Sequence, residues 1–223
     1  MQPAFAVRLN AFLRVKPFVS SEETRYYLNG VSIEPAAENG AVCAATDGHR
    51  LGVCFDPDGV SYRCVIVKVA RELAAWKPEH KLFGSPWLVG HVNENGLGYV
   101  SIVEPGSDAD GNDTAEHAIA RAEECSLRIG RAFIDGTFPN WRAVVPQNAA
   151  TGQSQTFNAD HVKAFTTKSA KIATIVGSSS DAPHLVRVEG DPNFVGVIMP
   201  VRAGSVDLPE WLVSAKPKMA KAA

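Results

Sequence analysis

One order of elements recurs three times along this chain: a strand, a helix and three further strands. The opening strand of the first unit is weak, whereas the second and third units show the full order. Such a repeat constrains the fold to similar units that pack together, because one unit cannot bury its apolar face alone. The expected elements are a helix near 5–18 and strands at 26–34, 40–46 and 49–55; a strand at 64–67, a helix at 68–77 and strands at 87–92, 98–104 and 126–134; and a strand at 155–158, a helix at 161–171 and strands at 172–176, 184–189 and 194–201.

The connections between these units differ from them in composition. The stretch 106–124 is polar, acidic and Gly-rich at its start, which predicts a long exposed hairpin loop or an insertion. Residues 147–154 are small and polar, as is typical of a linker. We therefore expect one domain at 1–147, a second at 148–203 and a tail at 204–223.

The composition limits the class of protein. Of the 223 residues, 45% are hydrophobic, which is enough for a sizeable core. The formal net charge of −2 argues against a protein that coats DNA by bulk attraction, although it leaves room for a basic patch. No apolar run approaches the roughly 20 residues that span a bilayer. Arg8 and Arg14 also interrupt the apolar N-terminal stretch, so we expect a cytoplasmic protein with no membrane partner.

The reactive side chains form no recognisable catalytic or metal site. The four cysteines have no CxxC spacing and most lie in apolar runs, which is typical of reduced, buried thiols. The histidines are scattered without metal-ligand spacing. Asp47 and His49 could form an acid-base pair, but no serine or cysteine nucleophile sits in a recognisable elbow. We expect no enzymatic activity, no metal and no cofactor.

Basic residues gather on the three predicted helices, although the chain as a whole is slightly acidic. No acid lies between residues 1 and 20, and bases outnumber acids in the helices of the other two units. If the helices line one surface, that surface presents positive potential to phosphates. The alternative is that these side chains only solvate exposed helix faces. The candidate DNA contacts on the helices are Arg8, Arg14, Lys16, Lys68, Arg71, Lys163, Lys168 and Lys171.

A second signal comes from two neighbouring motifs, RYYLNG at 25–30 and ATDGHRL at 45–51. The dipeptide Asp47-Gly48, between short apolar segments, is the strongest short-range mark of a hairpin. Together the motifs resemble the middle domain of the bacterial replicative sliding clamp, the beta subunit of DNA polymerase III. The resemblance implies a protein that encircles DNA and tethers polymerases.

Further motifs extend the resemblance, in order, over most of residues 5–202. VIVKVARELAAWK and IDGTFPNWRAVVP resemble the start and the end of the second half of the clamp's middle domain. FNADHVKAF and NFVGVIMPVR are similar to the second half of its last domain. The implied fold is the DNA clamp fold, of class α+β, in which strand-helix-three-strand units repeat with their helices on one face of antiparallel sheets.

The resemblance also implies a hydrophobic pocket between the middle and last domains. In the family this pocket receives a short linear peptide from polymerases, the clamp loader and repair proteins. Aliphatic walls and a flexible Met suit Leu and Phe anchors, while Arg and backbone groups at the rim orient the peptide. Without the family, the apolar members would read as ordinary core. The implied pocket residues are Leu28, Thr46, Gly48, His49, Arg50, Leu51, Pro139, Val144, Val186, Val197, Ile198, Met199, Pro200, Val201 and Arg202.

Arg25, Tyr26 and Tyr27 complete the set of candidate DNA contacts. The two tyrosines match family positions that approach the DNA, and tyrosine can stack on bases or donate to phosphate. Because adjacent strand residues point to opposite faces, one of the rings belongs to the core and Arg25 would do more of the phosphate contact.

Two departures from the family pattern concern the pocket. Ala143 stands where the family tends to carry a second arginine, which removes one polar contact at the rim. The chain also continues beyond Arg202, near the point where the family chain ends. Within that continuation, VDLPEWL at 206–212 has aliphatic and aromatic anchors, loosely like the peptides that clamps bind.

The chain is short for this family. A clamp chain carries six such units and two chains form a ring of twelve, whereas this chain holds three. Four chains would supply twelve units, a degenerate fourth unit would give a trimer, and the third alternative is that no ring forms. We predict a processivity factor that encircles duplex DNA as a homo-oligomer. The alternative is a truncated relative that binds replication proteins as a decoy or regulator without encircling DNA.

Overall fold

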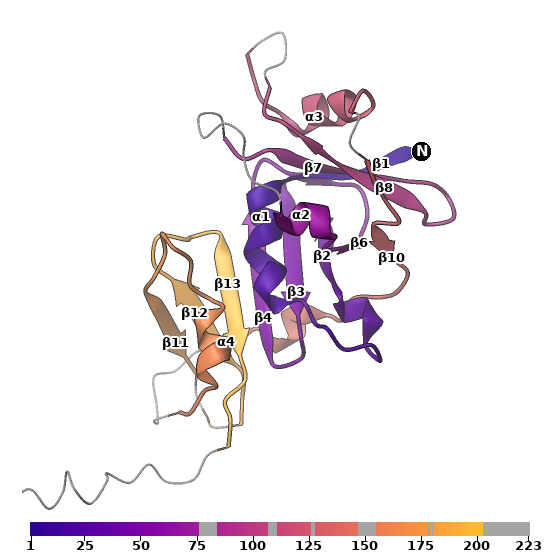
Figure 1. Ribbon diagram of the computed structural model, residues 1–223. Coiled ribbons are helices and arrows are strands. Elements are labelled where there is room, and N and C mark those ends of the chain that lie inside the picture. Colours follow the sequence, from indigo (N-terminus) through magenta and orange to yellow (C-terminus); the bar gives the residue numbers. More distant parts are fainter. Residues whose placement is uncertain are drawn as a thin grey trace, which may run out of the picture.

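Two antiparallel sheets form the framework of the chain, and helix α1 packs between them (Figure 1). The computed structural model describes residues 1–75, 84–106, 111–125, 128–146, 155–177, 179 and 181–202. Within the described residues, no helix is long and apolar enough to cross a membrane.

The elements fall into three successive units along the chain. The first unit comprises β1 (Gln2–Arg8), α1 (Leu9–Val15), the 3-10 turns η1 (Lys16–Phe18) and η2 (Tyr26–Leu28), β2 (Gly30–Pro35), β3 (Ala41–Thr46), β4 (Arg50–Asp56) and β5 (Val60–Ser61). The second comprises β6 (Val65–Lys68), α2 (Arg71–Ala75), β7 (Trp87–Val92), β8 (Gly98–Val103), α3 (Ala115–Ala122), β9 (Arg128–Gly130) and β10 (Phe133–Ile134). After the 3-10 turn η3 (Trp141–Val144), the third unit comprises α4 (Ala159–Lys163), β11 (Ala173–Val176), β12 (His184–Val188) and β13 (Phe194–Ile198).

The first two units exchange their opening strands. The five-stranded sheet has the order β5-β1-β7-β8-β9, so β1 of the first unit joins the strands of the second. The eight-stranded sheet has the order β10-β6-β2-β3-β4-β13-β12-β11, so β6 of the second unit joins the strands of the first. The third unit extends this sheet because β13 pairs with β4, from Phe194 opposite Cys54 to Ile198 opposite Arg50.

An aromatic cluster fastens the third unit to the first beneath this seam. The ring centroid of Phe18 lies 5.0 Å from that of Phe165 and 5.8 Å from that of Phe194, and all three side chains are fully buried. Gly52, on β4, lets the ring of Phe18 approach, since a Cβ there would overlap it. Burial of such rings stabilises the junction by about 2–3 kcal/mol for each.

Helix α3 lies within the stretch that the sequence predicted to be a loop or insertion. It covers the face of the five-stranded sheet opposite α1, where Ala115, Ala118 and Ala122 pack against Trp87 and neighbouring strand residues (Figure 1). The side chain of Thr114 caps the helix by accepting a hydrogen bond from the His117 N–H at 3.2 Å. The segment was predicted to be a loop because its start is acidic and Gly-rich, and the helical spacing of the alanines that follow was missed.

Two expected elements have the predicted type but were wrong over their first residues. The helix expected near 5–18 begins only at Leu9, because residues 2–8 form β1. Residues 4–7 are all buried, and a wholly apolar run has the same pattern in a buried strand and a buried helix. The strand expected at 26–34 begins at Gly30, after a 3-10 turn.

Other differences concern element limits. The strand expected at 126–134 is split between two sheets as β9 and β10, because Arg131 between them has a left-handed φ of 52°. Residues 155–158 belong to no strand in the described structure, and α4 is shorter than expected. Its N-cap is Asn158, whose side chain accepts a hydrogen bond from the Asp160 N–H at 2.9 Å. Part of the helix expected at 68–77 lies outside the described residues.

The thiols are all free, as expected, but not all are buried. Cys43 and Cys54 are buried on neighbouring strands, and burial raises the pKa of Cys54 to about 12. Cys64 is exposed and Cys125 is partly exposed, so the prediction of buried thiols was wrong for these two. The predicted domain limits at 147 and 203 and the predicted tail at 204–223 lie outside the described residues, and that division stays a prediction.

Candidate functional site

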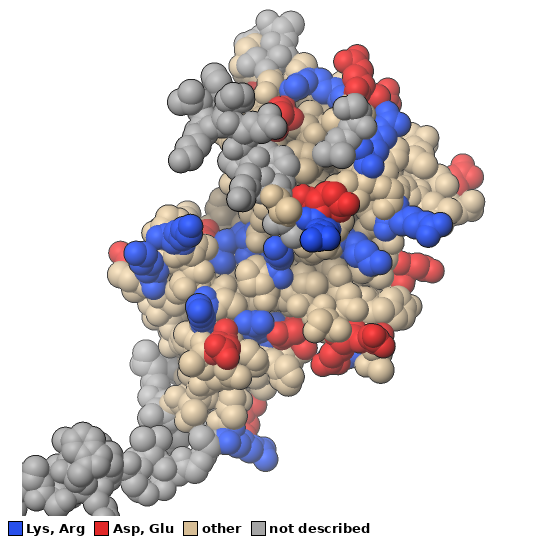
Figure 2. All heavy atoms as spheres, viewed as in Figure 1, with Lys and Arg blue, Asp and Glu red and all other residues tan. Residues whose placement is uncertain are grey.

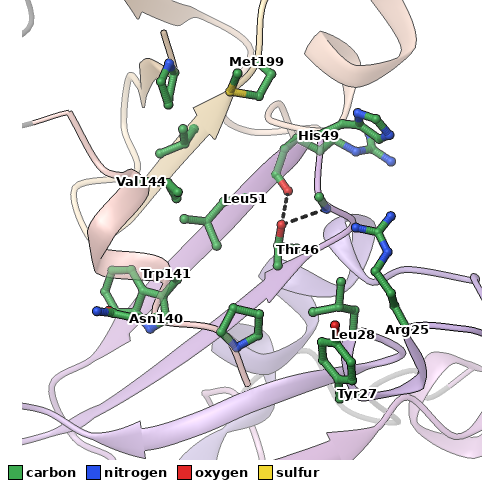
Figure 3. A pocket seen from close by; sticks show the side chains of 15 residues that line it. Arg25, Tyr27, Leu28, Thr46, His49, Leu51, Asn140, Trp141, Val144 and Met199 are labelled. Atoms are coloured by element: carbon green, nitrogen blue, oxygen red, sulfur yellow. Dashed lines mark hydrogen bonds between the residues drawn. The ribbon is translucent and has the colours of Figure 1, made fainter. Parts of the chain in front are cut away.

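A pocket of about 250 Å³ opens on the seam between the first and third units (Figure 3). Its walls come from η2, the β3–β4 hairpin, the segment around η3 and the end of β13. The pocket is lined by Arg25, Tyr27, Leu28, Thr46, Gly48, His49, Arg50, Leu51, Pro139, Asn140, Trp141, Val144, Pro183, Val197 and Met199.

The β3–β4 hairpin is held by its own Asp47. One carboxylate oxygen, Oδ1, accepts hydrogen bonds from the N–H groups of His49 and Arg50, each at 3.0 Å. The other, Oδ2, lies 2.9 Å from Nε of Arg50. Gly48 occupies the turn with φ of 90°, a conformation that few other residues adopt.

These contacts decide the charge state of Asp47. Burial alone would raise the pKa of its carboxyl, but the hydrogen bonds from the Arg50 side chain and from the two backbone N–H groups outweigh burial and lower that pKa. Asp47 therefore stays ionised and fixes the hairpin, whose residues Gly48, His49 and Arg50 reach the pocket. The proposed acid-base role of Asp47 has no support in these contacts, since its partner is Arg50.

The floor of the pocket is apolar. Leu28, Leu51 and Val197 are buried, and Met199 is half-buried beside them. On the opposite wall, Val144 is 45% exposed and points its side chain towards the cavity (Figure 3). Such a surface favours aliphatic or aromatic groups of a ligand, because their burial removes apolar area from water.

Glu34 fixes the η3 segment at the edge of the pocket. Its Oε1 accepts a hydrogen bond from Nε1 of Trp141 at 3.0 Å and lies 2.6 Å from Nη1 of Arg142. Trp141 and Phe138 also pack on the outer face of the eight-stranded sheet, against the cluster that contains Leu51. The wall that carries Val144 is therefore attached to the sheet rather than left as a free loop.

Polar groups stand at the rim. The guanidinium of Arg25 pairs with Glu22 at 2.7 Å and contacts the Asp47 carbonyl oxygen at 3.4 Å. The imidazole of His49 stacks on that of His161 from α4, with ring centroids 5.8 Å apart. These groups can orient a ligand whose apolar side chains enter the cavity.

The structure brings together most of the pocket residues implied by the resemblance, and it separates five of them from the pocket. Val186 and Ile198 are fully buried in the core on the opposite face of the sheet, since residues of one strand alternate between faces. Pro200, Val201 and Arg202 follow β13 outside the lining. Those that line the pocket are Leu28, Thr46, Gly48, His49, Arg50, Leu51, Pro139, Val144, Val197 and Met199.

Five lining residues were absent from the expected set. Arg25 and Tyr27 were assigned to DNA, but η2 turns them towards the pocket. Asn140 and Trp141 lie within the FPNWR motif, so the motif itself could have indicated them. Pro183 comes from the loop before β12, and only the fold places it there.

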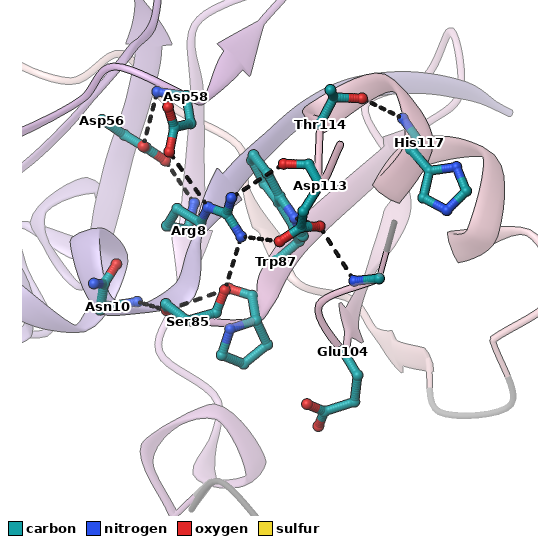
Figure 4. A network of polar contacts seen from close by, with 12 residues as sticks. Arg8, Asn10, Asp56, Asp58, Ser85, Trp87, Glu104, Asp113, Thr114 and His117 are labelled. Carbon is teal, nitrogen blue, oxygen red and sulfur yellow. Dashed lines mark hydrogen bonds and ion pairs between the residues drawn. The ribbon is translucent and has the colours of Figure 1, made fainter. Parts of the chain in front are cut away.

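Arg8, a predicted DNA contact, belongs instead to an internal network (Figure 4). Its guanidinium lies 2.6 Å from Asp113 Oδ2, donates to the Ser85 carbonyl oxygen at 3.0 Å and sits 3.8 Å from the ring centroid of Trp87. Its N–H donates to Asp56 Oδ2 at 2.6 Å. The side chain is 17% exposed, so Arg8 ties α3 to the sheet and is not free to bind phosphate.

Arg14 is likewise used within the fold. Its Nε lies 2.7 Å from Asp191 Oδ2, Nη2 donates to the Phe165 carbonyl oxygen at 2.6 Å, and the guanidinium stacks 3.6 Å from the ring centroid of Phe194. With 10% of the side chain exposed, Arg14 cannot reach a phosphate without breaking these contacts. Arg8 and Arg14 therefore each have an internal carboxylate partner, which argues against the predicted contacts with DNA.

The other candidate cations are available to solvent. Figure 2 shows Lys and Arg spread across the face on which α1, α2 and α4 lie, with Asp and Glu also present. Lys16 is half-buried, and Tyr26 is 54% exposed. The exposed members are Lys68, Arg71, Lys163, Lys168 and Lys171. Their role in DNA binding stays a prediction.

The described residues contain no group of three or more His, Cys, Asp or Glu side chains placed to hold a metal ion.

Comparison with known proteins connects this architecture to a family. Residues 9–60 match the family described as DNA polymerase III beta subunit, central domain. The beta sliding clamp of Escherichia coli K12 is 27% identical over 135 residues, which are 58% of this chain and 29% of that protein. The chain resembles a shortened bacterial beta sliding clamp.

Solved structures show the same clamp fold. The DnaN sliding clamp from Bartonella birtlesii, bound to griselimycin, has a TM-score of 0.62 at 16% identity and matches 91% of this chain and 67% of its own. The polymerase III beta subunit of Caulobacter crescentus has a TM-score of 0.60 at 19% identity, covering 91% and 67%. The clamp from Bacillus subtilis has a TM-score of 0.58 at 16% identity, covering 90% and 64%. The fold prediction is confirmed, and the chain is clamp-like over nearly its whole length but spans about two thirds of a clamp chain.

Proposed function

We propose that this chain is a sliding clamp-like processivity factor. It forms a homo-oligomer around duplex DNA in the cytoplasm and tethers polymerases or other replication and repair proteins, with no catalytic role of its own. The observation that carries this proposal is the apolar pocket at the β4–β13 seam of a chain with the clamp fold. The pocket lies between the two parts that resemble the clamp's middle and last domains.

The pocket suits the side chains of a short peptide rather than a large ligand. At about 250 Å³ it is below the range of roughly 300–1,000 Å³ that is usual for drug-sized ligands, so it accepts one or two anchoring side chains at a time. Leu and Phe anchors fit the apolar floor formed by Leu28, Leu51 and Val197. The rim groups Arg25 and His49 would bind the polar parts of the peptide.

Peptide binding is tested with a fluorescent peptide that carries Leu and Phe anchors. A Val144→Asp variant places a charge on the cavity wall and is expected to weaken binding about tenfold or more, measured by fluorescence anisotropy. The matched control is Tyr62→Asp, which places the same charge at an exposed apolar residue outside the pocket and should leave the affinity unchanged. Equal effects of the two variants, or no binding by the unaltered chain, would refute the pocket.

Encirclement would retain the protein on DNA by topology rather than by affinity. Exposed Lys163, Lys168 and Lys171 and the other free cations of the helix-bearing face provide weak, screened phosphate contacts that permit sliding. The test compares retention on closed circular DNA with retention on the same DNA after linearisation, loaded with and without a clamp loader. Preferential retention on circular DNA is expected. Equal dissociation of the protein from circular and linear DNA would contradict the ring.

The second candidate is a truncated relative that binds replication proteins as a decoy or regulator without encircling DNA. The engagement of Arg8 and Arg14 in internal ion pairs favours it, because the end of β1 and helix α1 then offer little free positive charge to DNA. This alternative predicts peptide binding without retention on circular DNA. The two measurements above therefore separate it from the first proposal.

A further inference from the structure

The exchange of opening strands sets a rule for how a unit is completed. In the first two units, β1 pairs with β7 and β6 pairs with β2. The three strands that follow the helix in each unit, its three-strand set, are therefore extended at their edge by the opening strand of the other unit. On its other side, each opening strand is flanked by the short strand that ends its own unit, β5 beside β1 and β10 beside β6.

The third unit also has an extended opening segment and three strands, but among the described residues it exchanges no opening strand with another unit. The N–H of Val201 donates to the Thr156 carbonyl oxygen at 2.8 Å, which corresponds to the bond from Tyr62 N–H to the Ala4 carbonyl oxygen at 2.9 Å between β5 and β1. Residues 155–158 therefore occupy the place of an opening strand. Among the described residues, they pair with no three-strand set, and β11 ends its sheet where β2 and β7 have a neighbour.

The exposed fractions show that no described residue covers either of these two strand-like segments. Every residue of β7 is buried and so are the first four of β2, whereas no residue of β11 is buried. Phe157 is only half-buried and Thr156 is exposed, whereas Phe5 of β1 is fully buried. Ile172, immediately before β11, is 62% exposed. Neither ATIV of β11 nor QTFN at 155–158 carries a charge of the kind that protects natural edge strands.

We propose that a second copy of this chain completes the third unit. Residues 155–158 of each copy pair with β11 of the other, and the two half-domains form one composite domain around a two-fold axis. A second copy is favoured because each chain carries both an unpaired edge, β11, and an unpaired extended segment, 155–158. Each of these can pair with the other one in the second copy, as an isologous interface requires. A single extended peptide would cover β11 and leave 155–158 unpaired.

The backbone indicates which groups face the partner. The Glu189 N–H donates to the Ile172 carbonyl oxygen at 2.9 Å, so Ile172 and, by the alternation of an antiparallel pair, Thr174 bond towards β12. The N–H and C=O groups of Ala173 and Ile175 consequently point to the open edge. This inference rests on the homo-oligomer of the proposed function but on neither DNA nor peptide binding, so its test needs neither ligand.

The full chain in the absence of DNA is examined by sedimentation equilibrium. We expect a dimer of twice the 23.9 kDa chain mass. Ala173→Pro removes one outward N–H from each open edge, without touching the bonds to β12, and should raise the dimer dissociation constant about tenfold or more. A monomer at all concentrations, or a dimer that Ala173→Pro leaves unchanged, overturns the proposal.

A second pair of variants guards against a folding defect in the proline variant. Ile172→Glu places a charge beside the open edge, at a residue that is 62% exposed, and Leu97→Glu places one on the β7–β8 turn at a similar exposure of 63%. Only Ile172→Glu should weaken the dimer. Hydrogen exchange supplies an independent readout: the amides of Gln155, Phe157, Ala173 and Ile175, which face the partner strand, should become protected as concentration rises. Protection that does not depend on concentration contradicts the pairing.

Discussion

At the scale of single residues, the contacts of a charged side chain decide its role more than its position on a helix does. Arg14 and Lys168 are both cations on predicted helices. The side chain of Arg14 is only 10% exposed and pairs with Asp191, whereas Lys168 is exposed to solvent. Asp47 similarly reads as a member of an acid-base pair but bonds to Arg50 and fixes a turn. Two predictions belong to this scale.

Replacing Arg14 should affect stability and not DNA binding. Arg14→Ala leaves Asp191 without its partner and removes the contact with the ring of Phe194, so the free energy of unfolding should fall by about 2–4 kcal/mol. Urea denaturation measures this change, and DNA affinity at low salt should match that of the unaltered chain. Lys168→Ala is the control, and it should show the opposite pair of effects.

The lowered pKa of Asp47 predicts an acid-sensitive hairpin. A carboxyl whose pKa is lower in the folded chain stabilises the fold above its unfolded pKa, near 3.8, and this contribution disappears as the pH falls through the folded pKa. Asp47→Asn should therefore lose less unfolding free energy between pH 6 and about pH 3 than the unaltered chain, by about 1 kcal/mol. Glu38→Gln, at an exposed site, is the control. An unchanged acid dependence in Asp47→Asn would contradict the proposed bonds.

At the scale of elements, a short anchoring network attaches α3 to the rest of the fold. Asp113 lies immediately before the helix and binds Arg8 at 2.6 Å, Nε1 of Trp87 at 2.8 Å and the N–H of Gly106 at 3.3 Å. Burial acts to raise the pKa of Asp113, but these hydrogen bonds outweigh it and lower that pKa. The anchor is therefore an ionised group at neutral pH.

Loss of this anchor should release α3. Asp113→Ala leaves Arg8 and the Trp87 N–H without their acceptor and is expected to lower the free energy of unfolding by about 2–3 kcal/mol. Hydrogen exchange should rise most at amides of residues 115–122. Asp58→Ala is the matched control: Asp58 lies 3.8 Å from Arg8 but is 64% exposed, so its removal should cost less than about 0.5 kcal/mol.

At the scale of the whole molecule, the pocket and the proposed dimer edge are built from different parts of one chain. The pocket lies on the β4–β13 seam, whereas β11 ends the sheet two strands away from β13. With three units in each chain, a ring of twelve requires four chains. A dimer of half-domains would be half of that ring, and its two free β9 edges would remain for closure.

This separation predicts that assembly and peptide binding can be uncoupled. Ala173→Pro should bind the anchor peptide within about twofold of the unaltered chain, because every lining residue comes from a single chain. Its retention on closed circular DNA should be lost, because half-domains that do not pair leave the ring open. Loss of peptide affinity in this variant would show that the pocket itself needs the second copy.

The amino-acid sequence by itself determined the order of the three units, the hairpin at Asp47-Gly48 and the family resemblance. These features depend on local turn chemistry and on apolar patterns within one element. The tertiary structure alone decided that Val186 and Ile198 face the core, that Arg8 and Arg14 pair with distant carboxylates, and that Arg25, Tyr27 and Pro183 reach the pocket. The partner of Arg14 is 177 positions away in the chain, and only the packing of the β4–β13 seam brings the two together. No local pattern carries that information.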